Sequence, residues 1–172
     1  MSFSTPLQVR LIKPSKYMPG GAVERFRRGY MPNSGLRHML ALTPAEVGGR
    51  PVESHIIDEY VECENLNYLD ALRPETCDVL GLVGVQSHQF HRALDIAALA
   101  RSQGVRHIVM GGPHPITCDT SQFHGSGVSF ALSEAELIWG RILADATEGG
   151  LLPLYGKEQR WQRELETSAL TP

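Results

Sequence analysis

The sequence predicts an α/β fold: a flavodoxin-like or Rossmann-like, doubly wound parallel sheet of five strands in the order 2-1-3-4-5, with helices on both faces. Three observations predict it. Five short apolar segments recur along the 172 residues, amphipathic helical patterns lie between them, and the connections are long enough to cross to a parallel neighbour. Near-continuous apolar strands are typical of a sheet that is covered on both faces.

Each predicted strand is a short run rich in Val, Ile and Leu. The five runs are residues 9–12, 52–57, 78–85, 107–110 and 128–132. The first stops at Lys13-Pro14, the second at Asp58-Glu59 and the fourth at Gly111-Gly112. Polar residues, glycine and proline directly after an apolar run predict the end of a strand.

Four helices are expected between and after the strands. Their apolar patterns occupy residues 36–40, 66–72, 90–98 and 137–146. Pro44, Pro74, Gly104 and Gly149 supply the stops. Ser133-Glu-Ala-Glu136 matches a capping box at the start of the last helix.

Length and composition indicate one domain over residues 1–157, followed by a charged tail or linker over 158–172. A long loop, 14–34, contains the basic stretch 25–28 and is functional or mobile. The net charge of −3 favours neither a nucleic acid nor an anionic membrane as a partner.

The cysteines and the N-terminal residues predict a cytoplasmic protein. No charged segment followed by an apolar run opens the chain, so we expect no secretion signal. Cys63, Cys77 and Cys118 lie far apart and are odd in number, which favours reduced thiols over disulfides, a zinc site or an iron–sulfur cluster.

Ligands of open parallel sheets bind beyond the carboxyl ends of the strands, which selects four loops here. These loops begin Lys13-Pro14-Ser15, Gln86-Ser87-His88-Gln89, Gly111-Gly112-Pro113-His114-Pro115 and Ser133-Glu134-Ala135-Glu136. Paired glycines after a central strand let a ligand or another backbone approach closely, although a simple tight turn explains them equally well. For Gly81 and Gly84, within the third strand, helix packing is the favoured explanation over a ligand.

Several other kinds of chemistry find little support. Gly125-Ser-Gly127 lacks the third glycine of a dinucleotide loop, and no Walker sequence occurs. The seven histidines show no H-E-x-x-H spacing, so no protein-bound metal is expected. Ser87 and His88 are sequence neighbours, which rarely meet as nucleophile and base. Glu134 and Glu136 suit acid–base work, but helix capping explains them as well, so no catalytic residue is predicted.

The ordered combination of these segments resembles a known family. Residues 78–85, Gly111-Gly-Pro-His-Pro115, Ser133–Glu136 and Leu154-Tyr155 together resemble the N-terminal cobalamin-binding domain of B12-dependent radical SAM enzymes. Ala41–Pro44 and Ile57–Glu59 extend the resemblance to roughly residues 7–157.

The resemblance implies a corrinoid, methylcobalamin or hydroxocobalamin, at the carboxyl edge of the sheet. It implies that the cofactor's nucleotide tail passes between sheet and helices at Gly111-Gly112, and that Ser133-Glu134 contacts this tail. The implied cofactor-binding residues are Pro14, Ser15, Gln86, Ser87, His88, Gly111, Gly112, Pro113, His114, Ser133 and Glu134. His88 is the candidate axial ligand to cobalt, which is the one metal expected.

The sequence departs from the family at four points. Asp119 is followed by Ser121 where the D-x-H-x-x-G motif of classical B12 enzymes has histidine. The loop after residue 85 is about one residue longer than in the family, and Ser133 replaces a glycine. The C-x-x-x-C-x-x-C cluster motif is absent, which implies a radical SAM domain or subunit as a partner.

We therefore expect a corrinoid carrier for methyl transfer, and whether the chain is itself an enzyme stays open. A cofactor-free regulatory or scaffold domain of the same fold is the alternative. A flavin-binding, flavodoxin-like protein is a weaker alternative, because the first loop lacks a Ser/Thr/Gly run to hold a phosphate.

Overall fold

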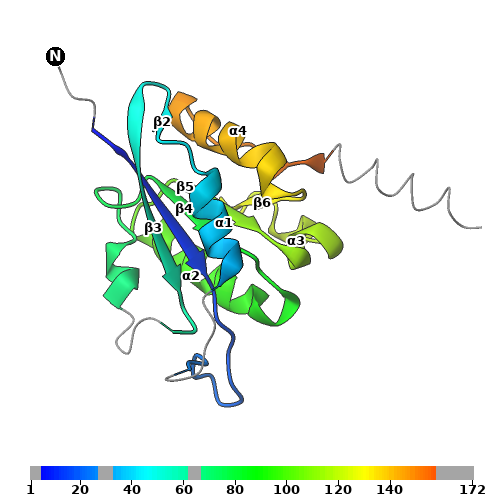
Figure 1. The fold of residues 1–172 in the computed structure, drawn as a ribbon. Coiled ribbons are helices and arrows are strands. Elements are labelled where there is room, and N and C mark those ends of the chain that lie inside the picture. Colours follow the sequence, from blue (N-terminus) through cyan, green and yellow to red (C-terminus); the bar gives the residue numbers. More distant parts are fainter. Residues whose placement is uncertain (1–4, 27–32, 62–66, 158–172) are drawn as a thin grey trace, which may run out of the picture.

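Seven strands form one mostly parallel sheet in the order β2-β3-β1-β4-β5-β6-β7 (Figure 1). The computed structural model describes residues 5–26, 33–61 and 67–157. The strands are β1 (Leu7–Lys13), β2 (Glu46–Val47), β3 (Arg50–Asp58), β4 (Val79–Leu82), β5 (His107–Gly111), β6 (Ser129–Ala131) and β7 (Leu154–Tyr155). The predicted α/β class with a mostly parallel sheet is confirmed.

The prediction of five strands is wrong, because a two-residue strand is added at each edge. The five predicted segments lie side by side as β3-β1-β4-β5-β6, while β2 pairs antiparallel with β3 and β7 pairs parallel with β6. Two-residue strands have no measurable apolar period. The turn between β2 and β3 could have been predicted from the pair Gly48-Gly49, because both residues adopt the positive φ that two-residue hairpins favour.

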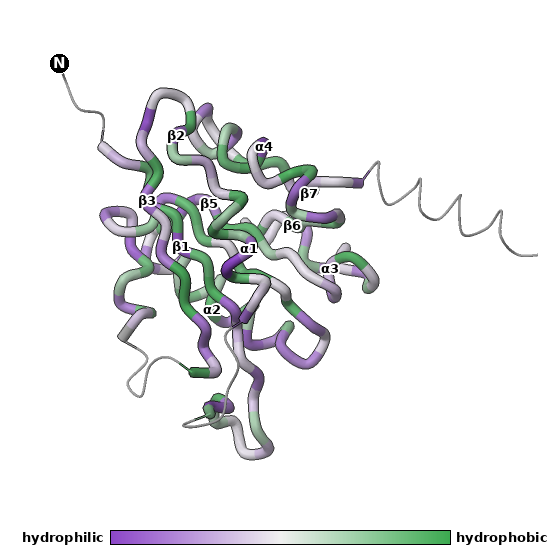
Figure 2. The backbone as a smooth tube through the Cα atoms, in the orientation of Figure 1, coloured by the Kyte–Doolittle hydropathy of each residue, from purple (hydrophilic) through white to green (hydrophobic). Residues whose placement is uncertain are grey.

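Helices cover both faces of the sheet. They are α1 (Ser34–Leu42), α2 (Phe90–Ser102), α3 (Pro113–Thr117) and α4 (Ala135–Glu148), with 3-10 turns η1 (Asn67–Ala71), η2 (Ser87–Gln89) and η3 (Ser121–Phe123). The apolar faces of α1 and α4 pack with Val9 and Leu11 in one core, and α2 packs with Leu80 and Ile108 in the other. The strands between them are accordingly the most hydrophobic part of the chain (Figure 2).

Local sequence explains where most helices begin and end. Asn33 caps α1, its Oδ1 accepting a hydrogen bond from Leu36 N at 3.1 Å, and the helix ends before Pro44. The predicted capping box at Ser133–Glu136 does not form, because α4 begins one residue later, at Ala135 after Glu134. Ser133 therefore lies outside the helix, and Glu136 has another partner.

Two expectations are only partly covered by the described residues. The pattern over 66–72 corresponds to the 3-10 turn η1, and Leu66 lies outside the described part. Cys63, part of the basic stretch 25–28 and the tail 158–172 also lie outside it.

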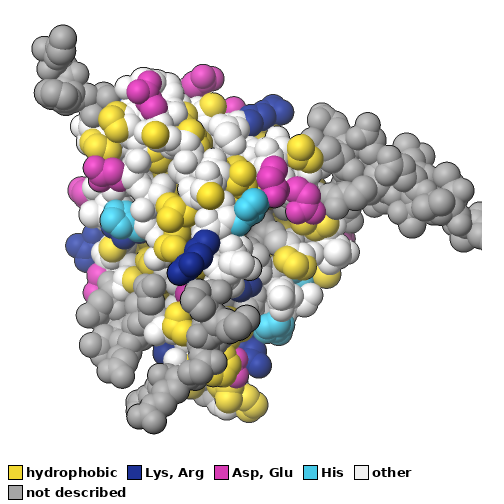
Figure 3. Space-filling view, in the orientation of Figure 1, with side chains coloured by type: hydrophobic (Ala, Val, Ile, Leu, Met, Phe, Trp, Pro, Cys, Tyr) yellow, Lys and Arg dark blue, Asp and Glu magenta, His cyan; other side chains and the backbone are white. Residues whose placement is uncertain are grey.

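In the view of Figure 3, hydrophobic, acidic and basic side chains are interspersed on the surface without a large patch of one charge.

Gly112 holds the turn after β5 directly against the loop after β4. It has a φ of 134°, and an added Cβ would lie 2.2 Å from Val85 N and 2.5 Å from the carbonyl carbon of Gly84. Both clashing atoms are backbone, so neither can turn aside as a side chain would. The loop and the turn can therefore touch only where residue 112 is glycine.

Substituting Gly112 by alanine should lower the free energy of unfolding by about 2–5 kcal/mol, the sum of backbone strain and a clash. Gly125 is the matched control, because its φ is also positive, 86°, but an added Cβ meets nothing within 4 Å. Gly125→Ala should cost about 1–2 kcal/mol through strain alone. Urea unfolding of both variants measures the difference, and equal losses would contradict the proposed contact.

Candidate functional site

A cavity of about 200 Å³ lies between the carboxyl ends of β4, β5 and β6 and the helices α1 and α4. Few side chains project into the cavity from the sheet, because that wall is made largely of glycine and alanine. The lining residues are Gly35, His38, Met39, Gly81, Leu82, Val83, Gly84, Val109, Gly111, Gly112, Ile116, Ala131, Ser133, Glu134, Ala135, Glu136, Ile138, Trp139 and Ile142. Most of these side chains are apolar, so the cavity suits a flat, largely apolar group.

The glycines beside the cavity also serve close packing within the protein. A Cβ on Gly81 would lie 2.8 Å from Leu11 Cδ2 and 3.6 Å from the ring of Trp139 on α4. Gly81 therefore allows close packing against β1 and α4, and it also lines the cavity. A Cβ on Gly111 would lie 3.2 Å from that of Ala131 on the neighbouring strand. Small residues here bring the strands and α4 together, and they also keep side chains out of the cavity.

Ser133 lines the cavity, but its hydroxyl is covered by protein. The residue follows β6, is 5% exposed, and its Oγ has no hydrogen-bond partner in the described part of the chain. A buried hydroxyl without a partner is costly. Less than 1 Å² of this Oγ is accessible, so a ligand in the cavity would not touch it.

His38 and Glu136 join the two helices that flank the cavity. The imidazole Nε2 of His38, on α1, lies 2.5 Å from Oε1 of Glu136, on α4, and both side chains are about half exposed. The backbone N–H of Glu136 and the imidazole of His38 lower the pKa of this carboxyl. Sequence reasoning assigned Glu136 to helix capping and missed its partner, which is 98 residues away.

A second polar group lies at the same edge of the sheet but outside the cavity lining. Nδ1 of His114 lies 3.0 Å from Oγ of Ser87, and the His114 ring stacks on Phe90 with centroids 4.0 Å apart. Burial, with help from nearby His91, lowers the pKa of His114, which favours a neutral ring. No carboxylate hydrogen bonds to His114 among the described residues, so a Ser–His–acid arrangement is not formed.

The predicted site residues therefore fall into separate groups. Gly111, Gly112, Ser133 and Glu134 line the cavity. Gln86, Ser87, His88, Pro113 and His114 do not line it, and all but His114 are exposed at the strand ends. Pro14 and Ser15 are buried elsewhere: the backbone N–H of Ser15 donates to Glu59 Oε2 at 2.9 Å and its hydroxyl to Glu24 O at 2.6 Å. The two hydrogen bonds of Ser15 hold the start of the loop after β1 against Glu59 and Glu24, which explains why this loop does not border the cavity.

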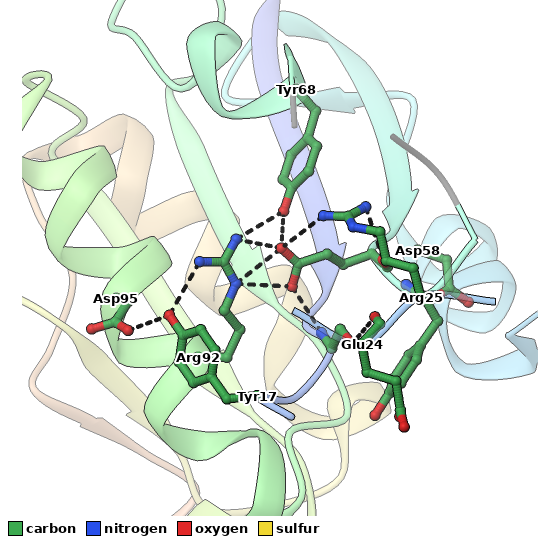
Figure 4. A network of polar contacts seen from close by, with 10 residues as sticks. Tyr17, Glu24, Arg25, Asp58, Tyr68, Arg92 and Asp95 are labelled. Atoms are coloured by element: carbon green, nitrogen blue, oxygen red, sulfur yellow. Dashed lines mark hydrogen bonds and ion pairs between the residues drawn. The ribbon is translucent and has the colours of Figure 1, made fainter. Parts of the chain in front are cut away.

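The loop after β1 is held by a buried network of charged side chains (Figure 4). Arg92 Nε, from α2, donates to both carboxylate oxygens of Glu59, at 3.0 and 3.2 Å, and the Tyr68 hydroxyl donates to the same carboxylate. Burial would raise the pKa of Glu59, but the bonds from Arg92, Tyr68 and the backbone of Ser15 outweigh it and lower the pKa. The paired charges of Glu59 and Arg92 hold this loop in place.

Lys13 connects this buried polar region to the cavity. Its ammonium donates to Gln89 Oε1 at 2.8 Å and to the carbonyl oxygen of Gly84, which lines the cavity. Burial lowers the pKa of Lys13 to about 8, although the carboxylate of Asp58 opposes the shift. These two hydrogen bonds of Lys13 hold the loop after β4 in position.

No group of three or more His, Cys, Asp or Glu side chains among the described residues is placed to hold a metal ion. No described helix is long and apolar enough to cross a membrane. Comparison with family models, curated proteins and solved structures finds no match to this chain. The function must therefore be inferred from the geometry of the site.

Substitution of Lys13 by methionine should change how stability depends on pH. The pKa of Lys13 is lower in the folded state, so between about pH 8 and 10.5 the unfolded chain binds a proton that the folded chain has released. Stability of the natural protein should therefore rise with pH across this window, relative to Lys13→Met, by up to about 3 kcal/mol. Denaturant unfolding at pH 8, 9 and 10 measures the difference.

Lys16→Met is the matched control, because Lys16 is partly exposed and lies in the loop that directly follows Lys13. A difference between the natural protein and Lys13→Met that stays constant over this range would contradict the shifted pKa.

Proposed function

We propose that this chain binds a corrinoid of the cobalamin type at the carboxyl edge of its sheet. The nucleotide tail would enter the cavity beside Gly111 and Gly112, and the corrin would lie outside it over the loops that follow β4 and β5. The observation that carries the proposal is the open cavity at this edge, lined by glycine and apolar side chains. This cavity occupies the place that the family resemblance implies for the tail.

The size of the cavity suits the tail and not the corrin. An apolar cavity of about 150 Å³ in another protein binds benzene, so 200 Å³ accommodates an aromatic base. Pockets that enclose whole drug-sized ligands are larger, about 300–1,000 Å³. The corrin would therefore rest on exposed residues at the strand ends, among them Gln86, His88 and Pro113.

Each group of residues would have a distinct part in holding the cofactor. Ser133 and Glu134, which line the cavity, would contact the tail, and the backbone at Gly111-Gly112 would pass close to the chain that connects it to the corrin. His88 stays the candidate axial ligand because it is exposed on η2. When bound, the cobalt of the cofactor supplies a transferable methyl group; this chain's residues bind and orient it, and a radical SAM partner would supply the rest.

The arrangement after β1 argues against the flavin alternative. A flavin phosphate needs free backbone N–H and hydroxyl donors at this turn. The N–H and the hydroxyl of Ser15 already donate to Glu59 and Glu24, and the Glu59 carboxylate would repel a phosphate. We also infer a cytoplasmic location, where Cys77 and Cys118, both free thiols in the structure, would stay reduced.

Purified protein incubated with hydroxocobalamin and then desalted should retain about one corrinoid per chain, measured by absorption. Ala135→Phe should weaken the affinity by about tenfold or more, because Ala135 lines the cavity and the larger ring would fill it. Leu137→Phe is the matched control, on the same helix but 62% exposed, and should bind as the natural protein does.

Circular dichroism would verify that both variants fold. A protein that retains no corrinoid contradicts the proposal and favours a cofactor-free scaffold. Equal binding by the two variants would place the cofactor away from the cavity.

A further inference from the structure

We infer that the side chain that this protein offers to the cobalt is the imidazole of His114, on α3, and not that of His88. This inference rests on the proposed function and deepens it, because it names the group that would bind the metal of the corrinoid. It follows from how the histidines at the carboxyl edge of the sheet are held by their neighbours.

The ring of His114 is fixed by contacts on two sides. Its Nδ1 lies 3.0 Å from Oγ of Ser87, in the turn after β4. Its ring packs against that of Phe90, at the start of α2, with centroids 4.0 Å apart. The backbone N–H of His114 also donates to Val85 O at 2.9 Å. The side chain therefore has a defined orientation before any ligand binds.

The hydrogen bond to Ser87 leaves the other ring nitrogen available. A neutral imidazole carries one proton, and when Nδ1 donates it to a hydroxyl, Nε2 keeps its lone pair. The Ser87 hydroxyl can accept this bond because its own proton has an acceptor, Cys118 Sγ at 4.0 Å. Nε2 of His114 has no hydrogen-bond partner in the part of the chain that the structure describes. Histidines that bind metals are held in this way, by a hydrogen bond from the nitrogen that does not face the metal.

His88 and His91 lack this support. Both side chains are exposed, and no hydrogen bond joins either imidazole to another described residue. A free side chain loses rotamer entropy when a metal fixes it, whereas the ring of His114 is already fixed. The exposure that makes His88 a candidate therefore also makes it the weaker ligand of the two.

His114 lies at the edge of the sheet where the corrin is proposed to rest. α3 begins after β5, η2 follows β4, and these two strands are neighbours in the sheet. The D-x-H-x-x-G sequence of classical B12 enzymes is absent from this chain, so a protein ligand to cobalt has to come from another position. The loop after β5 provides one.

The test uses the full chain loaded with cobalamin, reduced to the cobalt(II) state and examined by electron paramagnetic resonance. A bound nitrogen-14 splits each cobalt line into a triplet, and nitrogen-15 splits it into a doublet. Protein grown with nitrogen-15 histidine and loaded with natural cobalamin therefore distinguishes a histidine from the base of the cofactor. We expect a doublet that is lost in His114→Ala and kept in His88→Ala and in the control His91→Ala.

The other outcomes are equally decisive. A triplet in the labelled protein means that the base of the cofactor is still on cobalt, and an unsplit spectrum means that no nitrogen is bound. Either result overturns the inference and leaves the proposed function standing, as does a doublet that is lost in His88→Ala or kept in His114→Ala. A protein that retains no corrinoid overturns both. If circular dichroism shows that His114→Ala does not fold, a doublet kept in the double variant His88→Ala and His91→Ala supports the assignment, and its loss overturns it.

Ser87→Ala tests the hydrogen bond that orients the ring. It should keep the doublet but weaken the affinity for cobalamin by about tenfold, because the imidazole loses its partner. Ser87→Thr keeps the hydroxyl and should restore the affinity. Ser126→Ala, at an exposed serine in a loop, is the control and should bind as the natural protein does. An affinity that Ser87→Ala leaves unchanged would overturn the assigned role of this bond.

Discussion

The close contact between the loop after β4 and the turn after β5 is the constraint on which the site depends. Val85 N donates to Gly111 O at 2.9 Å, and His114 N donates to Val85 O at 2.9 Å, so the two segments are bonded backbone to backbone. Gly112 makes this approach possible, and the buried ammonium of Lys13 holds the Gly84 carbonyl from below. A side chain at Gly112 would separate the segments, and the wall of the cavity would move with them.

The two faces of the sheet have different roles: one holds the loop after β1 in place, and the other contains the cavity. On the face covered by α2, Arg92 pairs with the buried carboxylate of Glu59. The same carboxylate accepts a hydrogen bond from Ser15 and so holds the loop that follows β1. On the face covered by α1 and α4, small residues leave the cavity open. Breaking the first arrangement would leave a buried charge without its partner, which is strongly destabilising.

What could be predicted from the sequence was mainly local. Apolar runs and the turns that end them identified five of the strands, and the rule that ligands bind at the carboxyl edge selected Gly111, Gly112, Ser133 and Glu134, which do line the cavity. Pairings between distant segments gave no local signal. His38 and Glu136 are 98 residues apart, and Glu59 and Arg92 are 33 apart, so only the folded chain brings them together. For the same reason the burial of Ser15 against Glu59 was missed.

The two margins of the sheet differ in how copies of this protein would meet there. β7 has two residues, so the margin beyond β6 offers very few unpaired backbone N–H and C=O groups. β2 pairs only with Arg50 and Pro51 of β3, and beyond the bond from Val52 N to Ala45 O no described strand pairs with the outer side of β3. Long, flat margins recruit strands from other molecules and begin aggregation, so an intermolecular sheet would begin at β3 and not at β7.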